Sequence, residues 1–128
     1  MKPSAIHHVS VCVTDLGEAV DFYTRLLGMR PRHDRPSDLG PGAWLDAGPQ
    51  QVHLIEAAPP QACGQHFALV VDDLDTATAE LRTAGVEVSD AVPVGSARQA
   101  FVTDPSGNAI ELHEPPRASA PRRSRRTS

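Results

Sequence analysis

The chain has 128 residues, of which 40% are hydrophobic and only 4% aromatic, and a formal net charge of −4 at pH 7. This length is typical of one domain that buries a core without disulfide or metal support. Five of the twelve basic residues follow Pro116, so the preceding part carries seven basic against sixteen acidic residues, a net charge of −9 that argues against nucleic-acid binding there.

The first half of the chain, at about residues 5–57, predicts one βαβββ module. Residues 7–14 alternate as in a half-buried strand, with valines on the packing face and His8 on the other face. A helix is expected from Thr14 or Asp15 to Leu27, with Gly28 as its stop. Turn-rich segments then separate short strands expected at residues 29–33, 43–47 and 51–56.

The second half, at about residues 64–114, repeats the first. At an offset of 58 positions HVSVCVTDLGEAV, which begins at His8, aligns with HFALVVDDLDTAT, which begins at His66, and VHLIE aligns with IELHE. The repeat predicts a strand at 66–71, a helix from Asp72 or Asp73 to about Ala84, and strands near 86–89, 98–103 and 108–113. We therefore expect an α+β fold in which two tandem modules form a curved mixed-sheet cup, with helices on its apolar side.

Each module contains two residues of types that bind metals, and the two pairs have the same separation in the sequence. His8 precedes His53 by 45 residues, and His66 precedes Glu111 by 45 residues. The alternation of each strand places all four side chains off the apolar face. Imidazole and carboxylate groups on equivalent strands can converge on one divalent cation, so the repeat predicts a metal site formed by these four residues.

The sequence also predicts how far the domain extends and in which compartment the protein is found. We expect residues 1–116 to form a single domain and residues 117–128, rich in Arg and Ser, to form a disordered basic tail. The cysteines Cys12 and Cys63 make no disulfide framework, and the N-terminal residues lack the apolar segment of a signal peptide. No apolar run approaches the roughly 20 residues that span a bilayer. These features favour a cytoplasmic protein without membrane association.

From Ile6 to Glu114 the sequence resembles the vicinal oxygen chelate superfamily, which includes glyoxalase I, bleomycin-resistance proteins and extradiol dioxygenases. The segments that carry the resemblance are HVSVCVTDL with DFYTRLLG, AWLDAGPQQVHLIE and the closing DPSGNAIEL. The resemblance implies a glyoxalase-like fold, a homodimer, and a Zn, Ni, Co, Mn or Fe ion held by His8, His53, His66 and Glu111. His53 departs from the metal-dependent relatives, which often have Glu or Gln at this position.

The resemblance also implies an enzyme of the glyoxalase-like lyase or isomerase class. Its small-molecule substrate would bind through two vicinal oxygens, with Glu111 as both ligand and base. One alternative is an Fe²⁺ dioxygenase that uses His8, His66 and Glu111, and another is a non-catalytic resistance protein that binds a drug or metabolite. The sequence leaves open whether the site forms within one chain or across a dimer. Candidate pocket residues are Trp44, Phe101, Arg98 and His113.

Overall fold

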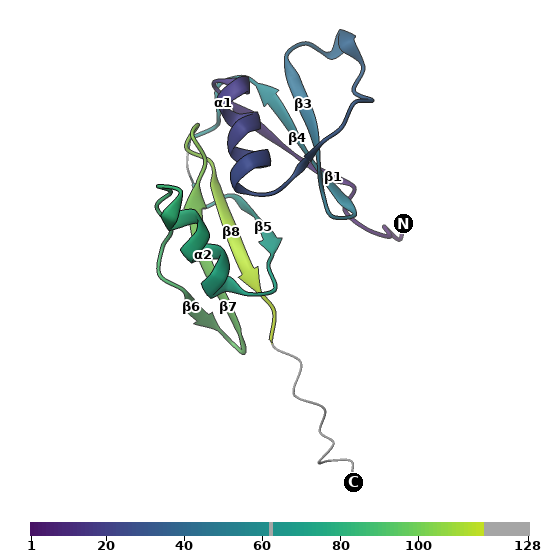
Figure 1. The fold of residues 1–128 in the computed structure, drawn as a ribbon. Coiled ribbons are helices and arrows are strands. Elements are labelled where there is room, and N and C mark those ends of the chain that lie inside the picture. Colours follow the sequence, from purple (N-terminus) through teal and green to yellow (C-terminus); the bar gives the residue numbers. More distant parts are fainter. Residues whose placement is uncertain (62, 117–128) are drawn as a thin grey trace.

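The computed structural model describes residues 1–61 and 63–116, so the predicted basic tail lies outside the described residues. Both halves are βαβββ modules, as the repeat predicts (Figure 1). The first contains β1 (His8–Val13), α1 (Leu16–Asp21), β2 (Arg30–Pro31), β3 (Gly42–Ala47) and β4 (Gln50–Glu56). The second contains β5 (His66–Val70), α2 (Leu74–Thr83), β6 (Val92–Val94), β7 (Ala97–Thr103) and β8 (Ala109–Glu114). The predicted α+β class is thereby confirmed.

Each module forms a mixed four-stranded sheet, with strand orders β1-β4-β3-β2 and β5-β8-β7-β6. The first strand of each module is parallel to the last, and the other neighbours are antiparallel. This topology sets β1 beside β4 and β5 beside β8. It therefore brings together residues that lie 45 positions apart in the sequence.

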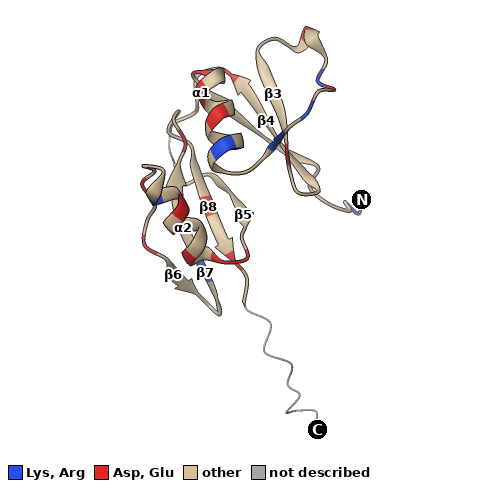
Figure 2. Cartoon of the chain, viewed as in Figure 1, with Lys and Arg blue, Asp and Glu red and all other residues tan. Residues whose placement is uncertain are grey.

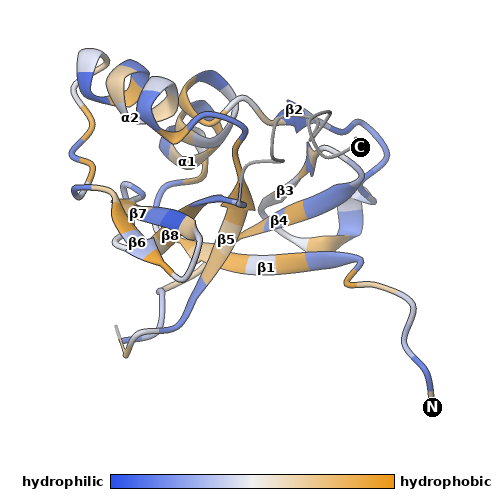
Figure 3. Cartoon of the chain, turned by 90° about the horizontal axis from the view of Figure 1, so that it is seen from below, coloured by the Kyte–Doolittle hydropathy of each residue, from blue (hydrophilic) through white to orange (hydrophobic). Residues whose placement is uncertain are grey.

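The two modules share one apolar core. Figure 3 shows both helices on the same side of the two sheets. The core cluster is continuous across the modules and includes the fully buried side chains Tyr23, Leu45, Leu54, Leu74 and Ile110. Because every second residue of a strand points into this core, the intervening residues of the same strands lie on the opposite face of each sheet.

Both helices start at aspartate caps, as the sequence predicts. The Asp15 side chain accepts a hydrogen bond from the Glu18 amide (2.9 Å), and the Asp73 side chain accepts one from the Thr76 amide (3.0 Å). These bonds satisfy amides that have no partner within the first helical turn.

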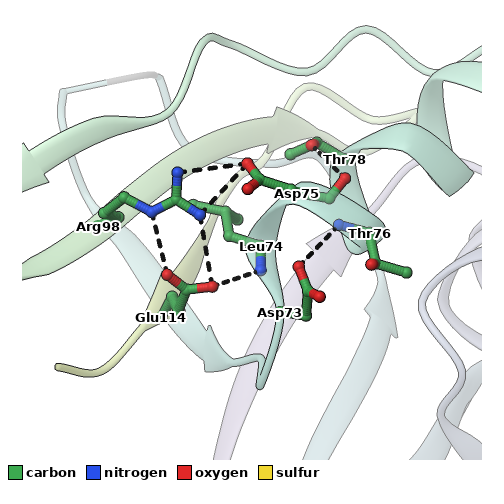
Figure 4. A network of polar contacts seen from close by, with 7 residues as sticks. All are labelled: Asp73, Leu74, Asp75, Thr76, Thr78, Arg98 and Glu114. Atoms are coloured by element: carbon green, nitrogen blue, oxygen red, sulfur yellow. Dashed lines mark hydrogen bonds and ion pairs between the residues drawn. The ribbon is translucent and has the colours of Figure 1, made fainter. Parts of the chain in front are cut away.

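A second carboxylate supports each helix start from the end of the last strand. Glu56 Oε2 accepts a hydrogen bond from the Leu16 amide (3.0 Å), and at the equivalent place Glu114 Oε2 accepts one from the Leu74 amide (2.7 Å). Only the second of these carboxylates is also paired with an arginine, since Arg98 Nε donates to Glu114 Oε1 (3.0 Å; Figure 4). These contacts of Glu56 and Glu114 with the helix starts were not predicted from the sequence.

Two strand predictions differ from the structure. The strand predicted near residues 86–89 is wrong, because only Val88 makes an isolated bridge, to Val102, and β6 begins at Val92. Gly95, at φ 61°, lies in the tight turn that pairs β6 with β7, so regular pairing begins next to that turn. The strand predicted at 29–33 shortens to β2, in which Pro31 has no amide hydrogen to donate to a sheet.

The helix predicted to run to Leu27 changes character at Phe22, where α1 gives way to the π-helical segment η1 (Phe22–Leu26). Tyr23 in this segment is fully buried, and its hydroxyl donates to Asp104 Oδ2 (2.7 Å) in the second module. Burial, together with the Asp104 carboxylate, raises the pKa of Tyr23, so the hydroxyl remains a donor. The Tyr23–Asp104 bond therefore links the two modules through their shared core.

Tyr23→Phe should destabilise the protein by about 1.5–3 kcal/mol, because it removes one donor from a buried carboxylate while keeping the ring. Urea unfolding of the metal-free protein would measure this change. An unchanged free energy of unfolding would show that the amides of Ser106 and Asn108, which also donate to Asp104, suffice to hold it.

No helix in the described ranges, 1–61 and 63–116, combines the length and apolar character needed to cross a membrane.

Candidate metal and substrate site

His8 and His53 form the first half-site, on the face of the first sheet that points away from the core. His53 is directly opposite Ser10 in the parallel β1–β4 pair, which makes His8 its diagonal neighbour. The two imidazole rings stack with centroids 3.9 Å apart and planes 15° apart. Trp44, which is opposite His53 on β3, stacks on its other side at 4.6 Å. The first half-site is thus a column of flat rings across three strands.

His66 and Glu111 form the second half-site, on the corresponding face of the second sheet. His66 Nε2 lies 3.0 Å from Glu111 Oε1. The other carboxylate oxygen, Oε2, lies 3.0 Å from His113 Nδ1. Phe101, opposite Glu111 on β7, contacts the His66 ring edge-on at 5.1 Å. Three of the predicted pocket residues, Trp44, Phe101 and His113, therefore contact a predicted ligand.

The two half-sites do not meet within one chain. Across the described residues, no group of three or more His, Cys, Asp or Glu side chains is close enough to hold a metal ion. Each module thus supplies one pair of the predicted four-residue set. The described residues of one copy therefore hold two pairs and no four-residue group.

The ring nitrogens of the three histidines fit a role as metal ligands. His66 Nδ1 donates to the Gly64 carbonyl (2.9 Å), which directs Nε2 toward Glu111. His53 Nε2 contacts Gln51 Oε1 (2.8 Å), which leaves Nδ1, and His8 Nδ1 contacts His7 Nδ1 (2.9 Å), which leaves Nε2. Metal-bound histidines commonly donate their second nitrogen to an oxygen acceptor, as His66 does to the Gly64 carbonyl and His53 to Gln51.

The spacing of the second half-site also fits a shared ion. Two atoms that each lie about 2.1 Å from one cation are roughly 3.0–3.4 Å apart, depending on the coordination geometry. The 3.0 Å between His66 Nε2 and Glu111 Oε1 agrees with this value. Three imidazoles and one carboxylate suit Zn²⁺ and the other first-row divalent ions.

Two of the histidines have displaced pKa values of opposite sign. The hydrogen bond to the Gly64 carbonyl, followed by the bond to Glu111, raises the pKa of His66 above 6.5. Burial, followed by the charge of His8, lowers the pKa of His53 below 6.5, and the nearby Arg32 and Arg35 act in the same direction. Deprotonated imidazole is the form that binds metal. His53 is therefore available to a cation at a lower pH than His66.

In the metal-free protein, we expect His66 to titrate above pH 6.5 and His53 below it, as measured by NMR of the ring protons. The raised pKa of His66 stabilises the fold below pH 6.5, and this contribution is lost as the pH rises through its folded-state pKa. Glu111→Gln should lower the His66 midpoint and leave His53 unchanged. A His66 midpoint at or below that of His53 would contradict the contacts described.

Arg98 makes different contacts from those expected of a pocket residue. Its guanidinium is held by Glu114 (3.0 Å) and Asp75 (3.3 Å) at the start of α2, as Figure 4 shows. The two ion pairs give Arg98 a structural role at the start of α2.

Other contacts of the half-sites were not predicted from the sequence. Gln51 lies two residues before His53 on the same strand face, so strand alternation carried a signal for its contact. The Gly64 carbonyl that holds His66 carried no such signal, because a backbone contact does not depend on residue type.

A cavity of about 300 Å³ lies beside the second half-site. It is lined by residues 9–12 of β1, by residues 60–61 and 63–67, and by residues 107–109 at the start of β8. Trp44, Phe101, Arg98 and His113 do not line it. The His66 end of the second half-site therefore adjoins a space large enough for a small molecule.

Comparison with known proteins supports the same class of molecule. The sequence profile of the Glyoxalase/Bleomycin resistance protein/Dioxygenase superfamily matches residues 5–112. An uncharacterized Escherichia coli K12 protein, YaeR, is 30% identical over 122 residues, which cover 85% of this chain and 95% of YaeR. The lactoylglutathione lyase of Escherichia coli O157:H7 is 33% identical over 121 residues, which cover 84% of this chain and 90% of the lyase.

Solved structures agree. A putative glyoxalase family protein from Bacillus anthracis superposes with a TM-score of 0.79 at 29% identity, covering 89% of this chain and 97% of that protein. TnmS3, an antibiotic-binding protein from Streptomyces sp. CB03234, superposes with a TM-score of 0.76 at 30% identity, covering 90% and 98%.

A duplicated βαβββ chain that presents a ligand-type pair on each sheet defines a paired-module protein of the glyoxalase-like fold. The chain belongs to the Glyoxalase/Bleomycin resistance protein/Dioxygenase superfamily.

Proposed function

We propose that the chain is a divalent-metal-dependent lyase or isomerase that acts on a small molecule held through two adjacent oxygens. The observation that carries this proposal is the second half-site. There His66 Nδ1 is fixed by a backbone carbonyl, while Nε2 and Glu111 Oε1 lie 3.0 Å apart. The His8–His53 pair occupies the equivalent place in the first module, and its rings, which stack face to face without metal, would have to turn to share an ion.

We further propose that two copies of the chain complete the site, with His8 and His53 from one copy and His66 and Glu111 from the other. The edges of the sheets support this arrangement, because β1 and β5 each end their sheet. Val70 on β5 is 70% exposed, and an apolar side chain on an open edge strand is typical of a contact surface. A twofold dimer would form two identical sites.

Glu111 is the residue proposed to move a proton. Its side chain is largely buried, and Oε2 is held by His113, so one carboxylate oxygen has a fixed position. A bound divalent ion supplies Lewis acidity toward the oxygens of the substrate. Glu111 would then take a proton from the adjacent carbon and return it at the neighbouring position, with His113 stabilising the carboxylate. Trp44 and Phe101 would keep water from the reacting carbon.

This proton transfer can be tested in D₂O with lactoylglutathione as the trial substrate. The compound is chosen because it appears in the name of the related lyases. Protein loaded in turn with Zn²⁺, Ni²⁺, Co²⁺, Mn²⁺ and Fe²⁺ should turn over this compound or exchange solvent deuterium into it. Glu111→Gln should abolish both reactions. Absence of turnover and exchange with every ion would remove lactoylglutathione as substrate, whereas absence of bound metal would overturn the enzyme proposal itself.

Binding without catalysis is the second candidate, and the ring column of the first half-site favours it. His8, His53 and Trp44 stack face to face, and a planar drug could extend this stack at one of its ends; TnmS3, which has the same fold, is an antibiotic-binding protein. If the chain only binds a ligand and does not catalyse a reaction, the purified protein should contain no metal. Fe²⁺-dependent dioxygenase activity also stays a prediction. Measuring oxygen consumption by the Fe²⁺-loaded protein would test it.

A further inference from the structure

Arg35 lies in the segment between β2 and β3, which Figure 2 shows to carry both basic and acidic residues. Its guanidinium lies against Gly42, at the start of β3. A Cβ atom on Gly42 would be 2.5 Å from Arg35 Nη2 and 2.9 Å from Cζ. The Leu54 carbonyl oxygen of β4 would also be 2.5 Å away, so the close approach of the β4 backbone already requires glycine here, and the Arg35 guanidinium occupies part of the space that glycine leaves.

This guanidinium is incompletely paired. Nη1 donates to the Gly40 carbonyl (2.8 Å), but Nε is buried without a hydrogen-bond partner, and no carboxylate in the described residues forms an ion pair with Arg35. Arg32, three residues earlier, contacts Asp34 (2.7 Å) and Asp46 (2.9 Å). Buried donors are nearly always paired in proteins, so a missing acceptor needs an explanation.

Arg35 also lies on the face that carries the first half-site. Gly42 and Trp44 are two residues apart on β3 and therefore point to the same face, about 7 Å from each other along the strand. Trp44 stacks on His53, which stacks on His8. The guanidinium thus places a positive charge beside the Trp44 end of this row of rings, displaced from it along β3. A ligand that lies on those rings would reach it.

We propose that Arg35 binds an anionic group, a carboxylate or a phosphate, of the small molecule that occupies this face. A guanidinium presents five N–H donors in a planar fork, and planar oxyanions accept two of them at once. The anion would meet the accessible part of the guanidinium, since Arg35 as a whole is only partly buried, and a shift of the side chain would bring the buried Nε within its reach. The inference rests on the proposed function for the choice of this face, but the anion contact itself requires no metal.

The test uses metal-free protein at constant ionic strength, with sodium acetate and inorganic phosphate as separate probes. The NMR signal of the Arg35 Nε–H group, assigned by its loss in Arg35→Lys, is followed in each titration. We expect a saturable shift with at least one probe, while the Arg32 signal stays in place. Acetate alone would identify a carboxylate, and phosphate alone a phosphate group. In Arg35→Lys, binding measured by calorimetry should weaken at least about tenfold, because a lysine lacks the planar fork.

Arg32→Lys is the matched control and should leave anion binding unchanged. No saturable Arg35 shift with either anion, or equal binding by wild type and Arg35→Lys, would overturn the proposal. The wild-type signal is read directly, so poor folding of a variant would not obscure the result. Metal content is measured on the same samples before the metal is removed. Anion binding by a protein that never holds metal would leave Arg35 assigned and reject the metal-dependent enzyme.

Discussion

Glu111→Ala should lower metal affinity at least about 100-fold, since it removes the only carboxylate of the proposed ligand set. His66→Ala, His8→Ala and His53→Ala should have similar effects, although His66 and Glu111 are in one module and the other two histidines in the other. Mass spectrometry of protein purified without added metal or chelator gives the content, and competition with a chelator gives the affinity.

His33→Ala provides the control, because His33 lies in the segment between β2 and β3 and belongs to neither half-site. It should retain wild-type metal content. Loss of metal in every variant except His53→Ala would instead support the three-residue set of His8, His66 and Glu111, as expected for an Fe²⁺ dioxygenase. Full retention in Glu111→Ala would contradict the ligand assignment.

Glu114→Ala should cost about 2–4 kcal/mol of stability, because it removes a buried carboxylate that holds two partners. Glu114 is 4% exposed and holds both the Leu74 amide at the start of α2 and the Arg98 guanidinium. Its removal leaves a partly buried arginine with only Asp75, which is mostly exposed. Urea unfolding of the metal-free protein measures the change.

The repeat supplies a matched control for this substitution. Glu56 holds the Leu16 amide in the same way, but it is exposed and no arginine is paired with it in the first module. Glu56→Ala should therefore cost only about 1 kcal/mol. Equal losses in the two variants would show that helix capping, and not the ion pair with Arg98, dominates at Glu114.

The sequence predicted the fold well because its signals were periodic. Alternation placed His8 opposite the valines, and the offset of 58 positions placed His53 and Glu111 on equivalent strands. The register of short strands was not accessible in this way. Val86 and Val88 suggested a strand, but the turn at Gly95 determines where β6 pairs.

The roles of individual arginines were also beyond the sequence. Arg98 precedes a strand that faces the expected pocket, yet Glu114 and Asp75 hold it at the start of α2. Arg35 carries no motif, and its importance depends on the space above Gly42 and on the absence of a carboxylate beside it in the described residues. Such properties arise from tertiary packing, which residue type and spacing do not encode.

Mixing two complementary double variants tests the central claim most directly. One variant, His8→Ala/His53→Ala, keeps only the second half-site, and the other, His66→Ala/Glu111→Ala, keeps only the first. Neither should bind metal alone. After subunit exchange, about half of the dimers would be mixed and one of the two sites in each would be intact, so the mixture should regain about a quarter of the wild-type metal content. A mixture that stays metal-free while mixed dimers form and the wild type binds metal would contradict a site shared between two copies.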